Sequence, residues 1–409
     1  MSLNSEQKKV VDSILSGDNV FITGSAGVGK SFLVKHITEL LTKENKTYRI
    51  LAPTGVAATN IGGMTIHRFL GLIPSIITIE DYVIKRMKNC KEAFNEIDVI
   101  FVDEISMVTP SLFKLMDEVI RIHVPKDTRP FSGIQMVLLG DLFQLPYIPD
   151  KDNTHPIFES PLWKSMNISI HQLHQVMRQD DPTFISALND LRLGKFSDNL
   201  KKVLRICINN KKDPNLHYVR LFSLNIQRQY ANETELAKLT TETRTFKSRD
   251  IGELKCLDGC QAVKTLILKV NCPVMLLRNL PEHDLYNGSL GVVTEFNPES
   301  GLPIVTFENG VILPIEKTSW EIAQRHKKKT TTIAARVQIP LAVAYSLSVH
   351  KSQGLTISHL EVDLNGVFTT GQMYVALSRA KTISGLIVKN FHPKHIQVDE
   401  RVLKWHENK

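Results

Sequence analysis

Hydrophobic residues in the first part of the chain occur in short, almost continuous runs with helical patterns between them. The four runs are "NVFITG", "YRILAPT", "DVIFVDE" and "QMVLLGD", at residues 19–24, 48–54, 98–104 and 135–141. Strands that are apolar on both faces are typical of a parallel sheet covered by helices on both sides. The pattern predicts an α/β lobe, which we assign to residues 1–165.

The same alternation returns after Ile170. The runs "VRLFSLN", "AVAYSLSVH", "HLEVDL" and "GLIVKNF" predict the strands of a second parallel sheet. Two α/β units of this kind indicate two lobes with a cleft between them. We assign the second lobe to residues 166–260 and 337–409.

Between the two parts of the second lobe the pattern changes to short strands separated by turn signals. The strands are "CPVMLLRNL", "GSLGVVTEF", "PIVTF" and "VILPI", and "NPESG" and "ENG" lie between them. Closely spaced strands with turns rich in Gly and Asn are typical of antiparallel structure. We predict a small β-barrel at residues 261–336, inserted into the second lobe. A long edge hairpin is the alternative.

Composition narrows the class of protein. Hydrophobic residues make up 42% and charged residues 22%, and Lys and Arg exceed Asp and Glu by 50 to 42, a net charge of +8. This balance suits a polyanionic partner without requiring one. No apolar run has the length of a membrane span, and five cysteines, an odd number, favour a reducing compartment. We expect a cytoplasmic or nuclear protein with no membrane partner.

A phosphate-binding loop follows the first apolar run. "GSAGVGKS" fits the pattern G-x₄-G-K-[ST] and lies between a strand and the helical pattern "SFLVKHITELL", which is the context the motif requires. Backbone N–H groups of such a loop point at phosphate oxygens, the lysine reaches the β- and γ-phosphates, and the serine hydroxyl binds Mg²⁺. The loop residues are Gly24, Ser25, Ala26, Gly27, Val28, Gly29, Lys30 and Ser31.

Asp103 and Glu104 end the apolar run "DVIFVDE". A carboxylate at the carboxyl edge of a parallel strand faces the nucleotide crevice. Asp103 is expected to hold Mg²⁺ and Glu104 to orient and deprotonate the attacking water. The adjacent glutamate favours hydrolysis of ATP over transfer of phosphate to a small acceptor, although a phosphotransferase stays as an alternative.

Three further residues are candidates for contacting the γ-phosphate of ATP. Gln144 follows the run "QMVLLGD", where a glutamine can contact both the attacking water and the γ-phosphate. Arg178 in "QVMRQDD" and Arg379 in "YVALSRAK" can stabilise a phosphoryl group during transfer. Since both arginines fall in the predicted second lobe, we expect them to reach ATP across the cleft. Bound nucleotide would then close the lobes and hydrolysis would release them.

Two loops are candidates for binding the nucleic acid strand along which a motor protein would move. "PTGVAATNIGGMTIHRFLGL" offers Thr54 and His67 to phosphates and Phe69 to a base, although Phe69 is equally compatible with a core position. "SVHKSQGLTI" offers His350, Lys351 and Ser352. Equivalent loops on two lobes would form a groove for a single nucleic acid strand.

Nine segments together carry a family resemblance that runs almost from end to end. They include "LNSEQKKVV", "VDEISM", "RPFSGIQMVLLGDLFQLP", "QVMRQDDPTF", "SVHKSQGLTI" and "GQMYVALSRAK". The chain resembles the PIF-type ("petite integration frequency") helicases, in the 5′-to-3′ branch of superfamily 1 that also contains RecD and Dda helicases. "PFSGIQMVLLGDLFQLP" and "HKSQGLTI…GQMYVALSRA" favour the PIF group over the other two.

The resemblance implies two RecA-like lobes, a small pin-type insertion at about 72–92 in the first and an Src-homology-three-like barrel in the second. It also implies ATP-driven translocation on single-stranded DNA, with Mg²⁺, and unwinding in the 5′-to-3′ sense at DNA forks. By the same resemblance Gln7 reads the adenine base and Gly354 lies at the nucleotide. We expect a monomer acting in DNA replication, repair or recombination.

Two departures and several alternatives stay open. "SLFKLMDEVIRIHV" matches the family's signature helix only loosely, and "LPYI" replaces a more usual pair of prolines. The compact form resembles viral or bacterial members, so a viral origin is one option. An RNA helicase is the main alternative within the motor class, because backbone tracking and stacking do not discriminate between sugars. A zinc site of Cys256, Cys260, Cys272 and His283 is disfavoured by its irregular spacing.

Overall fold

The computed structural model describes residues 3–72, 79–80, 94, 96–124, 127–148, 153–214, 216–252, 254–257, 260–283, 285, 287–326 and 329–409. The predicted insertion at 72–92 falls outside these residues except at 72, 79 and 80. Contacts along the chain divide it into two compact units. Unit 1 contains residues 1–207, 367–383 and 392–409, and unit 2 contains residues 208–366 and 384–391.

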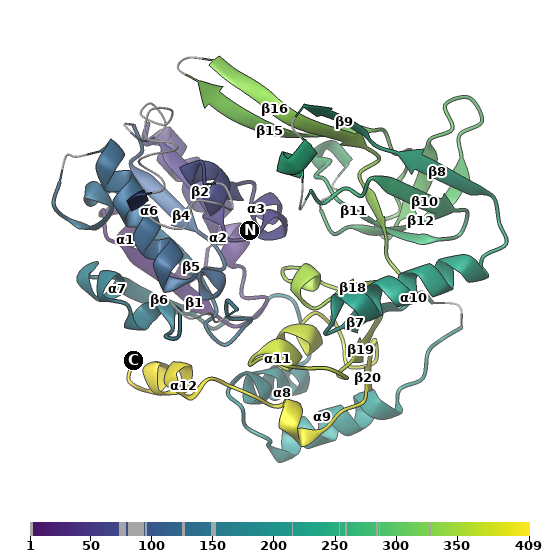
Figure 1. Cartoon of the computed structure of the whole chain (residues 1–409). Helices are drawn as coiled ribbons and strands as arrows, with labels where there is room; N and C mark the ends of the chain where they lie inside the picture. Colours follow the sequence, from purple (N-terminus) through teal and green to yellow (C-terminus); the bar gives the residue numbers. More distant parts are fainter. Residues whose placement is uncertain are drawn as a thin grey trace. The chain divides into compact units, whose positions relative to one another are not determined.

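Unit 1 is built on a six-stranded parallel sheet in the order β3-β2-β4-β5-β1-β6 (Figure 1). The strands are β1 (Val20–Gly24), β2 (Tyr48–Ala52), β3 (Met64–Thr65), β4 (Val99–Val102), β5 (Gln135–Gly140) and β6 (Ser169–Leu173). The four predicted apolar runs are β1, β2, β4 and β5, which confirms the parallel sheet.

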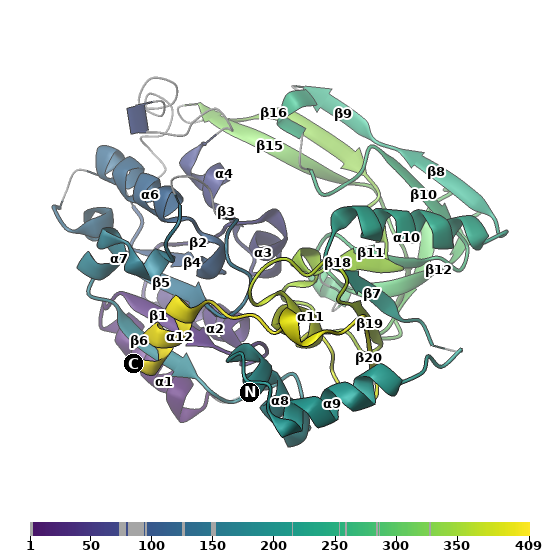
Figure 2. The same ribbon diagram turned by 60° about the horizontal axis from the view of Figure 1, so that its bottom comes forward.

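Alternate residues of these strands enter two hydrophobic cores on opposite faces of the sheet. Val20 and Ile22 pack in one core with α1 (Ser5–Leu15) and α2 (Lys30–Lys43). Phe21 packs in the other core with α6 (Pro110–His123) and α7 (Pro161–Ser165). Figures 1 and 2 show α6 beside β4 and β5 in both views. Because both faces are covered, the strands must be apolar throughout.

The remaining helices of unit 1 are α3 (Gly55–Asn60), α4 (Ile66–Leu70), α8 (Pro182–Arg192), α9 (Asp198–Asn209), α11 (Gln372–Leu377) and α12 (Glu400–Glu407). Pro182 at the start of α8 and the Asp181 side chain, which accepts from the N–H groups of Thr183 and Phe184, fix where α8 begins. Helix α12 returns to the first sheet (Figure 2), where Trp405 lies 6.0 Å from the Phe21 ring.

The observed units differ from the predicted lobe boundary at residue 165. Strand β6 pairs with β1 and completes the first sheet, and α11 packs against α8, so 166–207, 367–383 and 392–409 fall in unit 1. Sequence reasoning began the second lobe before β6 because β6 lacks an apolar run. Its residues Ser169–His171 are only half-buried, as expected at a sheet edge.

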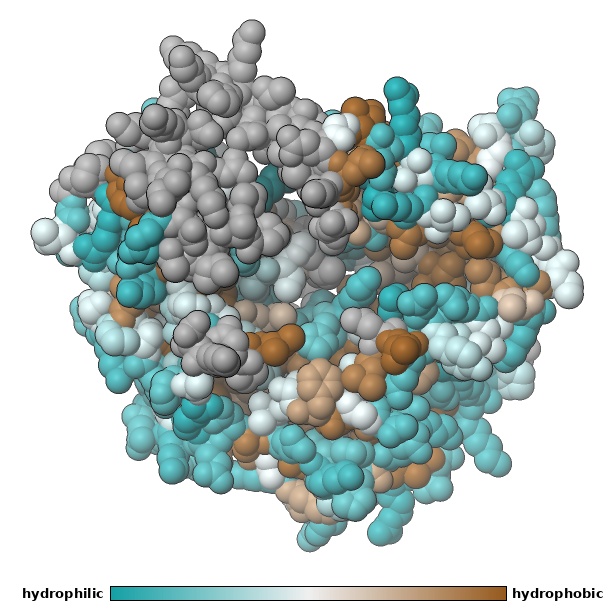
Figure 3. Space-filling view, viewed as in Figure 1, coloured by the Kyte–Doolittle hydropathy of each residue, from teal (hydrophilic) through white to brown (hydrophobic). Residues whose placement is uncertain are grey.

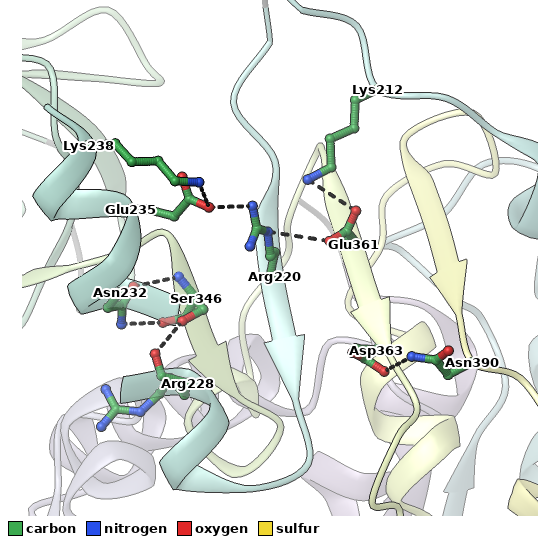
Figure 4. A network of polar contacts seen from close by, with 10 residues as sticks. All are labelled: Lys212, Arg220, Arg228, Asn232, Glu235, Lys238, Ser346, Glu361, Asp363 and Asn390. Carbon is green, nitrogen blue, oxygen red and sulfur yellow. Dashed lines mark hydrogen bonds and ion pairs between the residues drawn. The ribbon is translucent and has the colours of Figure 1, made fainter. Parts of the chain in front are cut away.

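Unit 2 contains a four-stranded parallel sheet in the order β18-β7-β19-β20. Its strands are β7 (Val219–Phe222), β18 (Ser346–Ser348), β19 (Leu360–Asp363) and β20 (Leu386–Lys389), and α10 (Asn225–Lys238) follows β7. These are the four runs predicted for the second sheet. Figure 4 shows Arg220 of β7 between Glu235 of α10 and Glu361 of β19, at 2.9 and 3.4 Å.

The rest of unit 2 is antiparallel. The predicted short strands are present as β11 (Pro273–Leu276), β12 (Leu290–Phe296), β13 (Pro303–Phe307) and β14 (Ile312–Pro314), in a five-stranded sheet that β17 (Leu341–Val343) completes. β8 (Thr243–Lys247) pairs with β10 (Thr265–Lys269). A long hairpin of β15 (Thr318–His326) and β16 (Lys329–Gln338) pairs with β9 (Arg249–Gly252). The strands therefore extend on both sides of the predicted range 261–336.

Most of the lower face in Figure 3 is hydrophilic, with hydrophobic residues occurring singly or in small groups. In the part of the chain that the structure describes, no helix combines the length and apolar character needed to cross a bilayer. Within the same residues there is no group of three or more His, Cys, Asp and Glu arranged to hold a metal ion.

Candidate functional site

The loop from Gly24 to Ser31 joins β1 to α2, and its glycines are required by the backbone. Gly27 and Gly29 have φ of 84° and 83°, in the left-handed region that favours glycine. A β-carbon at Gly24 would stand 2.5 Å from the Leu173 carbonyl oxygen, and one at Gly27 would stand 2.6 Å from Cβ of Arg178. The loop is therefore packed tightly between β6 and the residues that follow it.

Lys30 is buried among acidic groups. Its ammonium donates to the carbonyl oxygens of Gly24 at 2.8 Å and Ser25 at 3.2 Å. Burial lowers its pKa, while the carboxylates of Asp141, Glu104 and Asp103 act in the opposite direction. The lysine and these three carboxylates therefore lie close together.

Asp103 and Glu104 follow β4 directly. Burial, followed by the neighbouring Glu104 charge, raises the pKa of Asp103 to about 7. Glu104 has φ of 51° and ψ of 47°, a left-handed conformation at the start of the 3₁₀ helix η2 (Ile105–Met107). A non-glycine residue keeps such a conformation only when its surroundings hold it, and such residues are common at active sites.

Gln144 lies on a loop that a buried ion pair anchors. Its N–H donates to the Asp141 carbonyl at 2.9 Å. The Asp141 side chain is 0% exposed and accepts three hydrogen bonds from Arg192 of α8, at 2.8 to 3.1 Å. The Arg192 guanidinium also lies 4.4 Å from the centre of the Phe143 ring. Sequence reasoning missed this pair: Asp141 ends a predicted strand, but no local pattern indicates its partner 51 residues later.

Arg178 and Arg379 both fall in unit 1 with the phosphate-binding loop, whereas the sequence prediction grouped them with the second lobe. Arg178 donates to the Ser378 carbonyl at 3.1 Å, and Arg379, only 1% exposed, donates to the Val375 carbonyl at 2.9 Å. Burial, followed by the charge of Arg379, lowers the pKa of Arg178 to about 9, while Glu104 acts in the opposite direction. Two cationic groups therefore share a buried space near Glu104.

The segment that carries Arg379 contacts two other loops of the site. The hydroxyl of Tyr374 accepts the N–H of Ala26 at 2.8 Å. A β-carbon at Gly371 would stand 2.4 and 2.6 Å from the carbonyl oxygens of Phe143 and Gln144. Tyr374 was also missed from the sequence, where it appeared only as part of the "YVALSRAK" run. Its position on the phosphate-binding loop follows from a contact between residues 348 positions apart.

Gln7 lies next to Gly29 of the phosphate-binding loop. It forms a capping box with Asn4 at the start of α1: Asn4 N–H donates to Gln7 Oε1 at 3.1 Å, and Gln7 N–H donates to Asn4 Oδ1 at 2.8 Å. A β-carbon at Gly29 would stand 3.7 Å from Gln7 Nε2. The amide group is therefore held next to the loop.

The residues of unit 1 that were predicted to bind nucleic acid, Thr54, His67 and Phe69, differ from one another in their surroundings. The Thr54 hydroxyl accepts the N–H of Ala57 at 3.2 Å near the start of α3, and His67 is exposed on α4. Phe69 is only 8% exposed and packs at 5.0 Å from the Phe94 ring in a hydrophobic core. This corrects the stacking interpretation of Phe69, because a ring enclosed in the core has no face free for a base.

The corresponding residues of unit 2 follow β18 in the 3₁₀ helix η7 (His350–Ser352). Lys351 is exposed, and partial burial and the charge of Arg228 lower its pKa. Ser352 is fully buried and its hydroxyl donates to the Val349 carbonyl at 2.8 Å, so it is oriented inward and does not retain its predicted phosphate contact. Gly354 has φ of 85°.

Comparisons with known proteins identify the family to which the chain is similar. The PIF1-like helicase family matches residues 2–213, and the 2B domain of the DNA helicase Pif1 matches residues 258–296. A Danio rerio protein, ATP-dependent DNA helicase PIF1, is 36% identical over 98% of this chain and 63% of its own length. ATP-dependent DNA helicase Pif1 of Bdellovibrio bacteriovorus is 30% identical over 100% of this chain and 92% of its own.

Solved structures give the same result. Pif1 helicase from Candida albicans has a TM-score of 0.87 and 32% identity, covering 100% of this chain and 99% of that one. Bacteroides Pif1 in complex with ADP-AlF4 has a TM-score of 0.84 and 29% identity, covering 100% and 97%. Bacteroides Pif1 bound to single-stranded DNA has a TM-score of 0.76 and 29% identity, covering 100% and 97%.

The match extends over the whole chain, so the two parallel sheets are those of the two RecA-like lobes. The chain spans about two thirds or less of the length of the animal relatives, 63% for the Danio rerio protein. The relatives above come from an animal, a fungus and bacteria, and none supports a viral origin. On these matches and the site that accompanies them, the chain belongs to the PIF1-like helicase family.

Proposed function

We propose that this protein is an ATP-dependent DNA helicase that translocates 5′ to 3′ on single-stranded DNA and separates duplex DNA. The observation that carries the proposal is the enclosure of Arg178 and Arg379 in the unit that holds the phosphate-binding loop and Glu104. Two buried cations next to a carboxylate suit hydrolysis of a triphosphate. The cations can stabilise the negative charge on the transferring phosphoryl group in the transition state.

Five residues share the hydrolysis step. Glu104 orients and deprotonates the attacking water, and Gln144 contacts this water and the γ-phosphate. When the nucleotide binds, Lys30 gives up its hydrogen bonds to the loop carbonyls and contacts the β- and γ-phosphates instead. Arg178 and Arg379 stabilise the charge of the transition state. Because these cations are enclosed, little water competes for the phosphate oxygens.

Ser31 and Asp103 are the proposed Mg²⁺ ligands. Asp103 fits this role because a buried carboxylate next to Glu104 is costly to ionise, as its raised pKa reflects, and a divalent cation offsets that cost. Ser31 supplies an oxygen at the first turn of α2. A bound Mg²⁺ would neutralise phosphate charge at the β- and γ-oxygens.

The nucleotide is held by the backbone of Gly24–Ser31 and identified by Gln7. The Gln7 Oε1 atom is engaged in the capping box, and this contact fixes the Nε2 donor beside the loop where an adenine edge would lie. Gly354 is proposed as a further nucleotide contact from unit 2, on the family resemblance alone.

Thr54 and His67 in unit 1 and His350 and Lys351 in unit 2 are proposed to bind the DNA backbone. The net charge of +8 favours a polyanion, and salt-dependent binding is expected. The related Bacteroides Pif1 has been solved bound to single-stranded DNA, and another related structure concerns DNA unwinding at forked double-stranded DNA by two coordinating Pif1 helicases. Forks are therefore proposed as substrates here, with a monomer as the basic unit.

Two finer features are part of the proposal. The antiparallel strands of unit 2 form an Src-homology-three-like barrel. The setting is the nucleus or cytoplasm, in DNA replication, repair or recombination.

The test is unwinding of forked DNA that carries only a 5′ tail or only a 3′ tail, with RNA-tailed forks in parallel. We expect ATP-dependent strand separation on the 5′-tailed DNA fork. Opening confined to the 3′ tail would overturn the direction, and preference for the RNA tail would favour an RNA helicase. Transfer of labelled phosphate to an acceptor, with no free phosphate, would overturn the hydrolase assignment.

A further inference from the structure

Residues 367–383, which we call the arginine segment, run through the interior of unit 1. They contain α11 and Arg379, and all six residues of α11 are buried. In sequence, the segment continues on both sides into unit 2, at residues 366 and 384. Its position relative to the phosphate-binding loop therefore decides where the Arg379 guanidinium stands.

Tyr374 of α11 makes a polar contact with the phosphate-binding loop itself. Tyr374 is 3% exposed, and its hydroxyl oxygen accepts the N–H of Ala26 at 2.8 Å. A backbone N–H that is removed from water needs a partner, since leaving it without one costs roughly 1–3 kcal/mol. The contact is thus a specific, enclosed hydrogen bond rather than a surface contact.

The same helix holds the arginine. Val375, next to Tyr374, accepts from Arg379 Nε at 2.9 Å, and Ser378 Oγ accepts from Arg379 Nη2 at 3.0 Å. The path from the loop to the guanidinium therefore runs from the Ala26 amide through the Tyr374 ring and one turn of α11. Every step in this path is short and buried.

Two further contacts restrain the ends of the segment. Gly371, with φ of 70°, lies directly against the carbonyl oxygens of Phe143 and Gln144. Gln179 Nε2 donates to the carbonyls of Ser378 and Ala380 at 3.2 and 2.8 Å. These contacts restrain the segment on both sides of Tyr374, and the Tyr374 hydroxyl restrains α11 against the phosphate-binding loop.

We propose that Tyr374 is a positioning residue for ATP hydrolysis, whose hydroxyl ties Ala26 of the phosphate-binding loop to α11 and so places Arg379 at the γ-phosphate. The inference rests on the proposed role of Arg379. It goes beyond that role because it names the atom that positions the arginine. This atom is the hydroxyl oxygen of Tyr374, which takes no part in the reaction itself.

The variant Tyr374→Phe tests the hydroxyl alone, since it keeps the buried ring and removes one oxygen atom. Tyr48→Phe is the matched control, because Tyr48 lies at the start of β2 and packs on Phe101 away from the loop. Four quantities are measured on the full chain: the kcat and KM of DNA-stimulated ATP hydrolysis, the affinity for ADP, the affinity for ADP with aluminium fluoride, and the melting temperature.

For Tyr374→Phe we expect kcat to fall roughly 10- to 100-fold, the cost of a misplaced catalytic group, with KM for ATP within about twofold of the wild type. The affinity for ADP with aluminium fluoride should fall by a similar factor, since that complex imitates the transition state, while the affinity for ADP alone stays unchanged. The melting temperature should fall only by the few degrees that correspond to the loss of one buried hydrogen bond. Tyr48→Phe should match the wild type in all four quantities.

Two results would overturn the inference. One is a Tyr374→Phe protein with wild-type kcat and wild-type affinity for the fluoride complex. The other is an equal loss of ADP affinity and fluoride-complex affinity, which would mean a purely structural contact. Arg379→Ala, measured in parallel, separates the two proposals: normal turnover in that variant would refute the role of Arg379, whatever Tyr374→Phe does.

Discussion

At the scale of single residues, Glu104 carries the most specific prediction about catalysis. Its left-handed backbone places the carboxylate beside Lys30 and the buried arginines. The variant Glu104→Gln keeps the size of the side chain and removes its ability to accept a proton. We expect kcat for ATP hydrolysis to fall about 10²- to 10⁴-fold, while binding of ATP and of single-stranded DNA is retained.

Lys30→Ala is the companion variant, and it should lose ATP binding as well as hydrolysis because the lysine contacts the phosphates in the ground state. Both variants are measured by phosphate release and by fluorescence anisotropy of labelled DNA. Turnover at the wild-type rate in either protein would refute the catalytic assignment.

Arg379 is predicted to act mainly in the transition state. Arg379→Ala should keep the affinity for ATP within a few-fold and lower kcat by about 10³-fold or more, the range found for arginines that act on a transferring phosphoryl group. Steady-state kinetics and equilibrium binding of a non-hydrolysable ATP analogue separate the two quantities. A variant whose ATP affinity collapses while its kcat survives would show that Arg379 binds the ground state instead.

The candidate site was only partly predictable at this scale. Lys30, Asp103, Glu104 and Gln144 were found because each lies at the end of an apolar run or inside a local motif. Arg192 and Tyr374 were not, because their partners Asp141 and Ala26 are distant in sequence and the pairing is created by tertiary packing. Phe69 was left open, because an aromatic residue in a loop pattern fits a core and a binding surface equally well.

At the scale of secondary structure elements, the apolar runs predicted both parallel sheets, and the turn signals predicted β11 to β14. The misplaced boundary has a physical cause: β6 is half-buried at the sheet edge and carries His171 and Gln172, so it lacks the pattern of the central strands. Closure of antiparallel strands into a barrel depends on twist and register between strands, which local periodicity does not encode.

An ion pair between two of these strands gives a pH-dependent prediction. Asp250 of β9 and Arg336 of β16 lie 2.6 Å apart, and hydrogen bonding from Arg336 lowers the pKa of Asp250 from 3.8 to about 2. A carboxyl whose pKa is lower in the folded state stabilises the fold above its unfolded pKa, and the contribution is lost as pH falls from about 4 toward 2.

Asp250→Asn should therefore lower the free energy of unfolding at pH 7 by roughly 1–2 kcal/mol, allowing for partial screening by solvent. Below about pH 2 the difference from the wild type should vanish, since both side chains are then neutral. Urea unfolding at a series of pH values measures this, with Asp213→Asn, at an exposed loop position, as the control. A difference that does not depend on pH would show that the charge of Asp250 is irrelevant.

At the scale of the whole molecule, the division into two units explains how hydrolysis can be transmitted. The arginine segment belongs to unit 1, but the chain enters it from unit 2 and leaves it into unit 2. Any shift of Arg379 toward or away from the γ-phosphate must therefore move covalent connections to both neighbouring parts of unit 2. Such a coupled element is what a motor needs, because the nucleotide state then biases a second unit.

The same division predicts which part of the protein nucleotide stabilises. The three tryptophans separate by unit: Trp163 lies in the core of unit 1, Trp405 is half-buried against that core, and Trp320 lies on β15 of unit 2. A Trp320→Phe protein therefore reports the unfolding of unit 1 by its fluorescence alone. Because the phosphate-binding loop, the carboxylates and both arginines are all in unit 1, Mg²⁺ with ADP and aluminium fluoride should stabilise that unit directly.

At a ligand concentration about a hundred times its dissociation constant, the fluorescence midpoint of Trp320→Phe should rise by roughly 5–10 °C. Adding Lys30→Ala to this protein should abolish most of the rise, and adding Arg379→Ala should reduce it for the fluoride complex but not for ADP. If the midpoint of unit 1 does not move with any nucleotide, the nucleotide does not bind where the shape of the loop and its charges predict. In that case the assignment of the whole site, and not of one residue, would have to be abandoned.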